Sequence, residues 1–274
     1  MKELINHITA QLATVYPEDE AQALAWWIME EETGLSRSQM LTGCKGTTNF
    51  SNLQAKIERI LHFEPIQYIF GHTLWNGLDL KVTPATLIPR PETAELVEKV
   101  ERLKVKGERI KVLDIGTGSG CIAIALKKAH PEWQVTGIDI SEEAIEVAKE
   151  NAKRNGVEVE LLVADIFNLQ SPISNLQYDI IVSNPPYICE SEKADMRPNV
   201  LNYEPATALF VPDNDPLKFY RRIAELKLGK HLFFEINEAY PDELSAMLSE
   251  LGYTDIQITN DIYGKPRIIE ARMA

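Results

Sequence analysis

Apolar residues recur every three or four positions in the first part of the chain, as on one face of a helix. The first such stripe consists of Leu4, Ile5, Ile8, Leu12 and Val15. A second helix is predicted to begin at Pro17, because proline favours a first helical turn and three acidic residues follow it. Ser36 and Ser51 are candidate N-caps of two further helices. The pattern therefore predicts a helical domain over residues 1–65.

The apolar period changes to two after this region. Leu78, Leu80 and Val82 alternate with polar residues behind Asn76-Gly77, and an apolar stretch that begins at residue 66 precedes that pair. An Asn-Gly pair between apolar runs is typical of a β-hairpin. We therefore expect a hairpin linker over residues 66–86, followed by a larger domain over residues 87–274.

Strands and helices are predicted to alternate in that larger domain. The apolar runs that predict strands are residues 110–115, 134–138, 158–163, 178–182, 231–236, 255–259 and 267–271. Helical patterns cover about residues 93–103, 120–129 and 141–154. Such alternation predicts an α/β fold with a mainly parallel seven-stranded sheet covered by helices on both faces. The connection between the last two strands is too short for a parallel crossover, so these strands are expected to form an antiparallel edge hairpin.

Composition narrows the classes of partner. The chain has 274 residues, a formal net charge of −13 and a pI of about 4.9, and this charge disfavours stable binding to nucleic acid. The three cysteines match neither a disulfide framework nor a zinc pattern, and no metal site is expected. No segment approaches membrane-spanning length and the start has no apolar leader. We expect a cytoplasmic monomer without a membrane partner.

A glycine-rich turn joins the first strand of the larger domain to its helix. It consists of Gly116, Thr117, Gly118, Ser119 and Gly120. Glycines let a ligand approach the main chain closely, although a tight connection alone would also use them. The third glycine comes one residue earlier than in the dinucleotide fingerprint, which argues against a pyrophosphate cradle.

Two carboxylates follow at the ends of the next two predicted strands. Asp139 lies 21 residues after Gly118 (139 − 118), where a carboxylate can accept both ribose hydroxyls. Asp165 precedes Ile166 and Phe167, which together could bind and pack an adenine. These pieces describe a nucleoside site without a phosphate-binding group, so S-adenosylmethionine fits better than NAD. Asp114 could either stabilise the loop or meet the methionine amino group.

A stiff loop follows the strand that ends near residue 182. It consists of Asn184, Pro185, Pro186 and Tyr187. Two prolines cannot donate to a sheet ladder, so the strand must end there. The Asn184 side-chain oxygen and the Pro185 carbonyl could accept both N–H groups of a planar amide or amine, with Tyr187 stacked on it, and so orient its nitrogen for methylation. The alternative is that the prolines only form a turn.

These motifs resemble the peptide chain release factor glutamine methyltransferases of the HemK/PrmC type. The resemblance covers nearly the whole chain and includes residues 65–71 (PIQYIFG), 88–93 (IPRPET), 112–120 (VLDIGTGSG), 183–188 (SNPPYI), 203–205 (YEP) and 261–267 (DIYGKPR). Asn-Pro-Pro-Tyr alone also occurs in enzymes that methylate adenine or guanine, so residues 88–93 together with the N-terminal helical part are much more specific for this family. Three departures stand at Ile166, at residues 210–217 and at Asn237, where the family often has an aromatic residue, a glycine-containing run and a glycine.

The resemblance implies a substrate, namely the glutamine of the Gly-Gly-Gln motif in class 1 release factors, which would be the protein partner. It implies cofactor contacts at residues 116–120, Asp139, Ile166 and Asn184, and glutamine contacts at residues 184–187. Arg90 lies in a family motif near the site, without an assigned role. The resemblance also implies a Rossmann-like class I methyltransferase fold for the larger domain. The helical domain would recognise the substrate. Two alternatives remain. One is an amino methyltransferase acting on nucleic acid, against which the acidic pI argues. The other is a non-catalytic cofactor-binding module, against which the intact reaction loop argues.

Overall fold

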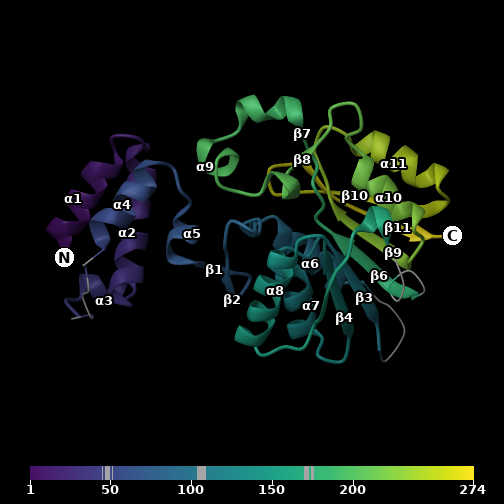
Figure 1. The fold of residues 1–274 in the computed structure, drawn as a ribbon, viewed down its shortest axis with the longest axis horizontal. Helices are drawn as coiled ribbons and strands as arrows, with labels where there is room; N and C mark the ends of the chain where they lie inside the picture. Colours follow the sequence, from purple (N-terminus) through teal and green to yellow (C-terminus); the bar gives the residue numbers. More distant parts are fainter. Residues whose placement is uncertain (45, 47–49, 51, 104–108, 170–172, 174–175) are drawn as a thin grey trace. The chain divides into compact units, whose positions relative to one another are not determined.

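A computed structural model describes residues 1–44, 46, 50, 52–103, 109–169, 173 and 176–274. The chain forms two compact units. We call the first, Met1–Gly71 with Arg197–Tyr203, the helical unit, and the second, His72–Met196 with Glu204–Ala274, the sheet unit. Figure 1 shows both units with their helices and strands.

The helical unit contains α1 (Lys2–Leu12), α2 (Glu18–Thr33), α3 (Arg37–Leu41), α4 (Leu53–Leu61), α5 (Ile66–Phe70) and α9 (Pro198–Leu201). Ile5, Ile8 and Leu12 of the predicted stripe are buried, and Val15, beyond the end of α1, is exposed. Ser36 caps α3 through a capping box, as predicted. Ser51 lies outside the described residues.

The hairpin prediction is right around Asn76 and wrong at its start. Strands β1 (His72–Trp75) and β2 (Leu78–Lys81) pair antiparallel across a turn in which Asn76 and Gly77 both have positive φ, 46° and 72°. Residues 66–70, which we expected to belong to the hairpin, instead form α5. Ile66 and Ile69 are three residues apart and bury together, and Gly71 ends the helix in the left-handed region. A helix this short shows too few turns for its period to be distinguished in the sequence.

The seven-stranded sheet of the sheet unit consists of β3 (Lys111–Ile115), β4 (Gln134–Asp139), β5 (Glu160–Val163), β6 (Tyr178–Ser183), β9 (Gly229–Glu235), β10 (Tyr253–Asn260) and β11 (Pro266–Met273). Their order is β10-β11-β9-β6-β3-β4-β5. The five strands from β9 to β5 are parallel, and β11 runs antiparallel to both β9 and β10. The predicted parallel sheet with an antiparallel edge hairpin is confirmed.

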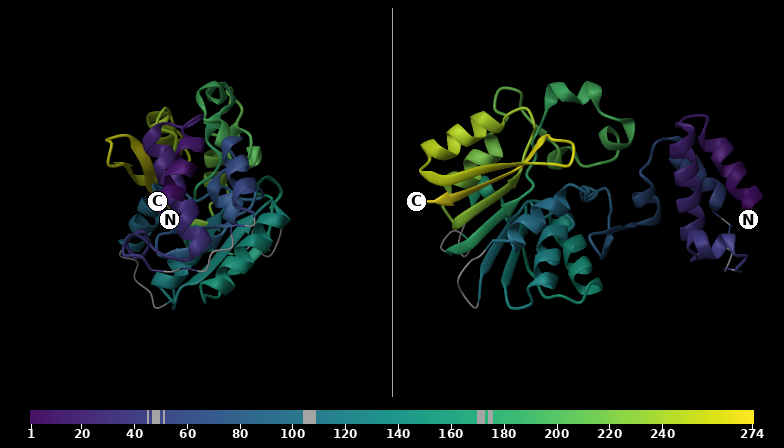
Figure 2. Two further views of the ribbon diagram at one scale, coloured as in Figure 1. Left: turned by 90° about the vertical axis from the view of Figure 1, so that its left-hand side faces the viewer. Right: turned by 180° about the vertical axis from the view of Figure 1, so that it is seen from behind.

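Helices cover both faces of this sheet. They are α6 (Thr93–Glu101), α7 (Cys121–Ala129), α8 (Glu142–Arg154), α10 (Lys218–Glu225) and α11 (Pro241–Glu250). Successive residues of one strand point to opposite faces, so Val112 packs in the core beneath α6 to α8, whereas Leu113 packs beneath α10 and α11. The view from behind in Figure 2 shows the two helical layers on either side of the strands.

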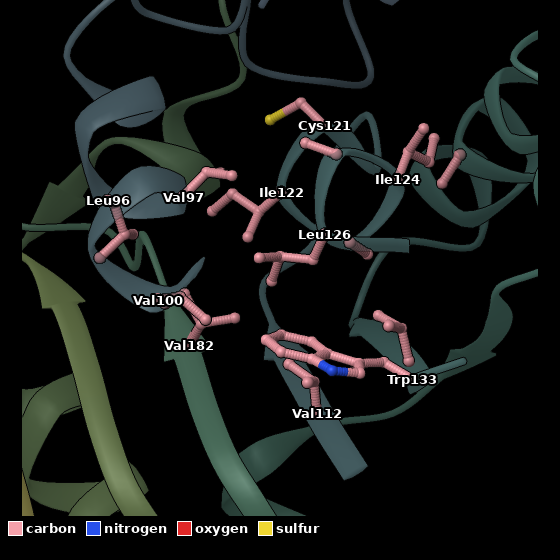
Figure 3. Packing of buried hydrophobic residues seen from close by; sticks show 14 of the residues in the cluster. Leu96, Val97, Val100, Val112, Cys121, Ile122, Ile124, Leu126, Trp133 and Val182 are labelled. Carbon is pink, nitrogen blue, oxygen red and sulfur yellow. The ribbon is translucent and has the colours of Figure 1, made fainter. Parts of the chain in front are cut away.

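The core beneath α6 and α7 is packed from residues distant in sequence, as Figure 3 shows. Its labelled members include Leu96, Val97, Val100, Val112, Ile122, Leu126 and Trp133. The dense packing gives the carboxyl ends of the central strands a rigid support.

Short helices and strands complete the sheet unit. They are η1 (Ile166–Asn168), β7 (Ile188–Cys189), η3 (Glu190–Asp195), η4 (Ala206–Ala208) and β8 (Phe210–Val211). Strands β7 and β8 form a small parallel pair. In the part of the chain that the structure describes, no helix is long and apolar enough to cross a membrane.

Candidate active site

A cavity of about 450 Å³ opens at the carboxyl ends of β3, β4 and β6, within the sheet unit. This edge is where open α/β sheets bind ligands, and the volume suits a small molecule. Most of the predicted site residues line it: Arg90, Gly116, Thr117, Gly118, Ser119, Asp139, Asp165, Ile166, Phe167, Asn184, Pro185 and Pro186. The structure thus brings the predicted cofactor and reaction residues to one cavity. Gly120 and Tyr187 are not among the residues that line it.

The glycine loop (residues 116–120) owes its shape to backbone conformation and to a buried carboxylate. Asp114 Oδ2 accepts hydrogen bonds from Thr117 Oγ1 at 2.6 Å and from the Ala123 amide at 3.3 Å. Burial raises the pKa of Asp114 to about 7, and its Oδ1 is buried without a hydrogen-bond partner among the described residues. These contacts support the loop-stabilising role of Asp114.

The early third glycine has a packing reason. A Cβ atom at Gly120 would lie 3.0 Å from Ile124 Cδ1 and 3.1 Å from Ala148 Cβ. Gly120 begins α7 with φ +81°, where it faces α8. It therefore allows close approach of two helices rather than of a ligand, which is why it does not line the cavity.

Asp139 lies where β4 ends and holds two loops. Its Oδ2 accepts from the Gly118 amide at 2.9 Å, and its Oδ1 accepts from the Ser141 amide at 3.0 Å. Each carboxylate oxygen has a second acceptor position, so both remain able to bind a hydroxyl in the cavity. The ribose assignment stays a prediction that this geometry allows.

The apolar end of the cavity is formed by aromatic rings from two elements. Phe167 and Phe219 pack edge to face with ring centroids 5.4 Å apart, and Lys218 Nζ lies 4.9 Å from the Phe167 centroid. Asp165 Oδ1 accepts from the Phe167 amide at 2.9 Å and so holds the start of η1. Sequence reasoning found Phe167 but missed Lys218 and Phe219, because nothing local connects the start of α10 to this edge.

The side-chain NH₂ group of Asn184 is held by a hydrogen bond. Its Nδ2 donates to Thr93 Oγ1 at 3.2 Å, and Thr93 Oγ1 donates to Glu235 Oε2 at 2.7 Å. Thr93 also lines the cavity. It belongs to the motif at residues 88–93, which drew attention to Arg90 but not to this hydroxyl.

Tyr187 makes a hydrogen bond through its hydroxyl group and packs its ring against the protein core. The hydroxyl donates to Glu235 Oε1 at 3.0 Å, and the ring packs against the core beneath α10 and α11. Burial and the Glu235 carboxylate raise the pKa of Tyr187. Asn237, which stands where the family often has glycine, donates from Nδ2 to the Tyr187 carbonyl at 3.0 Å. The predicted stacking of Tyr187 on a substrate stays a prediction.

Arg90 is engaged in an ion pair at the cavity wall. Its guanidinium donates to Glu204 Oε1 at 2.6 Å, and Glu204 Oε2 accepts from the Ile88 amide at 3.1 Å. The Glu204 carboxylate is almost fully buried. Through these two hydrogen bonds it connects Ile88 and Arg90 of the loop that precedes α6.

Residues 210–217, where the sequence departs from the family pattern, contain β8. The carboxylate of Asp213, which follows β8, accepts hydrogen bonds from the amide and the hydroxyl of Ser191. Within the described residues, no group of acidic, histidine and cysteine side chains could hold a metal ion.

Two family models match the chain. One is described as the PrmC N-terminal domain and matches residues 3–71, and the other is a methyltransferase domain that matches residues 106–226.

Two curated relatives named release factor glutamine methyltransferase match nearly the whole chain. The protein from Bacteroides thetaiotaomicron is 42% identical over 283 residues, covering 99% of this chain and 99% of the relative. The protein from Flavobacterium psychrophilum is 41% identical over 281 residues, covering 98% of each.

Solved structures are similar in fold. The hMettl16 catalytic domain in complex with MAT2A 3′UTR hairpin 6 has a TM-score of 0.59 at 18% identity, covering 97% of this chain and 92% of that one. A methyltransferase from Pyrococcus furiosus has a TM-score of 0.52 at 21% identity, covering 81% of this chain and 98% of that one. At such identities the likeness shows the fold alone.

Proposed function

We propose that this chain, which belongs to the release factor glutamine methyltransferase family, methylates the glutamine of the Gly-Gly-Gln motif in class 1 peptide chain release factors. The methyl group would come from S-adenosylmethionine and would go to the side-chain amide nitrogen. One observation of the structure supports this proposal most directly. Asn184, held by its amide nitrogen, lines the same cavity as the glycine loop and Asp139.

The residues around the cavity fit S-adenosylmethionine. When bound, this cofactor supplies an electrophilic methyl group on a positively charged sulfur. Asp139 would accept the ribose hydroxyls, and Asp165 with the Ile166 and Phe167 side chains would bind the adenine. The apolar lining around Phe167 and Phe219 suits a flat base, and Gly118 leaves its backbone open to the cavity.

The reaction loop (residues 184–187) would orient the glutamine. An amide nitrogen is a weak nucleophile because its lone pair is delocalised into the carbonyl. The Asn184 side-chain oxygen and the Pro185 carbonyl would accept its two N–H bonds, holding the nitrogen in line with the methyl group. The rigid proline pair keeps both acceptors in place without an ordering cost at each turnover.

We further propose that the helical unit recognises the release factor. A short amide side chain offers little binding surface, so selection of one glutamine in a whole protein requires contacts beyond the cavity. The helical unit has its own buried core, with members such as Ile8, Ile28 and Ile57, and so can present a surface of fixed shape.

Mass spectrometry of a purified class 1 release factor tests the activity. After incubation with the enzyme and S-adenosylmethionine, we expect one added methyl group on the glutamine of the Gly-Gly-Gln peptide. A release factor with that glutamine replaced by alanine serves as the control and should gain none. An unmodified glutamine in the wild-type factor would overturn the proposal. Methylation of protein-free RNA or DNA under the same conditions would instead favour a nucleic-acid methyltransferase.

A further inference from the structure

Three hydrogen bonds connect the reaction loop to a buried carboxylate. Asn184 Nδ2 lies 3.2 Å from Thr93 Oγ1, which lies 2.7 Å from Glu235 Oε2, and the Tyr187 hydroxyl lies 3.0 Å from Glu235 Oε1. Thr93 begins α6 and Glu235 ends β9, so two further elements meet the loop after β6 here. Thr93 and Glu235 are almost fully buried.

The directions of these bonds follow from the number of protons available. An ionised carboxylate only accepts, and a hydroxyl has one proton to donate. Thr93 therefore uses its proton on Glu235 and can only accept from Asn184. Because only the NH₂ end of Asn184 can meet an accepting oxygen, the amide has one favourable orientation of its two. Its carbonyl end is then left for the cavity that Asn184 lines.

The second oxygen of Glu235 stabilises this arrangement. Tyr187 donates to it, so both carboxylate oxygens have a hydroxyl donor. Burial has the largest effect and raises the pKa of Glu235 above its usual value, while the two hydroxyl donors and the positive charge of Arg267 limit this rise. The hydrogen-bond directions given above are those of the ionised carboxylate. Arg267 is in turn bound by Asp261 at 3.1 Å.

We propose that Glu235 and Thr93 are positioning residues that orient the Asn184 amide so that its oxygen can accept an N–H from the substrate. This inference rests on the proposed function for the identity of the substrate. It also assigns Tyr187 a role through its hydroxyl, which fixes the carboxylate, in addition to any contact of its ring. If the amide were reversed, Asn184 would present a donor to the two N–H donors of the substrate nitrogen, and the nitrogen would lose its orientation.

A pair of substitutions at Thr93 separates orientation from packing. Thr93→Val keeps the shape and removes the hydroxyl, whereas Thr93→Ser keeps the hydroxyl. We expect Thr93→Val to lower kcat about tenfold or more, by analogy with the loss of a group that orients a metal ligand, with little change in the KM for S-adenosylmethionine. Thr93→Ser should keep kcat within about threefold, since the hydrogen bonds remain.

Thr136→Val is the matched control. Thr136 Oγ1 also donates to a glutamate, Glu160 Oε2, at 3.0 Å, but in β4 away from the cavity lining. It should keep the wild-type kcat, and it should lose less stability than Thr93→Val, because Glu160 is exposed and can bind water in place of the hydroxyl. Equal kcat in Thr93→Val and the wild type, or an equal loss in Thr93→Ser and Thr93→Val, would overturn the inference.

A second variant keeps the inference testable if Thr93→Val does not fold. In Glu235→Gln, one end of the new amide must donate to Thr93 or to Tyr187, which frees a hydroxyl proton and removes the fixed direction. We expect a similar loss of kcat with a retained fold.

The side-chain ¹⁵N resonance of Asn184 reports the hydrogen bond without any methyl transfer. It should shift in Thr93→Val and in Glu235→Gln and keep its position in Thr136→Val. An inactive wild-type enzyme with these shifts would refute the proposed function alone, whereas an unmoved resonance would refute the positioning role alone.

Discussion

The glycine loop and the reaction loop line the same cavity but present their chemistry in different ways. The glycine loop offers backbone, and its shape comes from glycines and from Asp114, which lies two residues before Gly116. The reaction loop offers a side chain, and the direction of Asn184 depends on Thr93, 91 residues earlier. Local sequence therefore determines the first loop largely by itself, whereas the second needs the folded sheet.

This difference predicts how each loop fails. Changes in the glycine loop should act through conformation, stability and cofactor affinity. Changes in the reaction loop itself, as at Asn184, should act on turnover and leave the fold intact.

Asn184→Ala should produce the largest loss. The variant removes an acceptor for the substrate N–H, and by analogy with the loss of one aligned catalytic group we expect kcat to fall about a hundredfold to a thousandfold. Asn184 lies at the cavity surface, so no core cavity should form. Methyl transfer to the release factor and the melting temperature are measured together. A melting temperature that falls sharply would show that Asn184 has a mainly structural role.

Asp114→Asn should change the pH dependence of stability. The pKa of Asp114 is raised from 3.8 to about 7, so the folded state holds the proton more tightly than the unfolded state. Its contribution to stability is complete below about pH 4 and is lost as the pH rises towards 7. Relative to Asp114→Asn, the wild type should lose up to about 3 kcal/mol of unfolding free energy between about pH 4 and pH 6, at roughly 1.4 kcal/mol per pH unit.

Urea unfolding of both proteins across this range measures the difference. Comparison with the variant cancels the carboxylates whose pKa values are lowered, such as Asp179 and Asp261, which act in the opposite direction. Parallel curves for the two proteins would mean that Asp114 titrates normally.

The sheet could be predicted because its strands are continuous apolar runs bounded by polar turns. Val112 and Leu113 are both buried, one on each face, so a short unbroken apolar stretch was the right signal. Helices α10 and α11 were not predicted. The spacing of Leu244, Leu248 and Leu251 is that of one helical face, so the sequence does indicate α11. In α10 the apolar stripe is shorter and gives a weaker helical signal.

The site could be predicted only as far as its chemistry is local. The glycines and Asn184 follow the ends of strands and Asp139 is the last residue of one, so their shared edge follows from parallel topology. Glu235 lies within a predicted strand and is separated from Thr93 by 142 residues. No spacing rule connects them, because their contact depends on how α6 packs against the end of β9.

Gly120→Ala should destabilise the fold more than Gly116→Ala. Both glycines have positive φ, 81° and 71°, so both substitutions carry backbone strain, but only at Gly120 would the new Cβ meet Ile124 and Ala148. We expect a loss of about 1–3 kcal/mol at Gly120 beyond the strain that the two share. Thermal unfolding measures it. Equal melting temperatures would show that α7 and α8 adjust without cost.

Asp139→Ala should weaken cofactor binding about tenfold or more, because hydrogen bonds to a charged acceptor contribute about 1.5–3 kcal/mol. The variant also removes the bonds to the Gly118 and Ser141 amides, so part of the loss could come from the loop rather than from the ribose. Asp139→Asn separates the two effects, since its amide oxygen can still accept from one of these backbone amides while the charge is gone. Calorimetry with S-adenosylhomocysteine gives the affinities. If both variants bind like the wild type, the ribose assignment fails, and if only Asp139→Asn does, the carboxylate acts mainly by shaping the glycine loop.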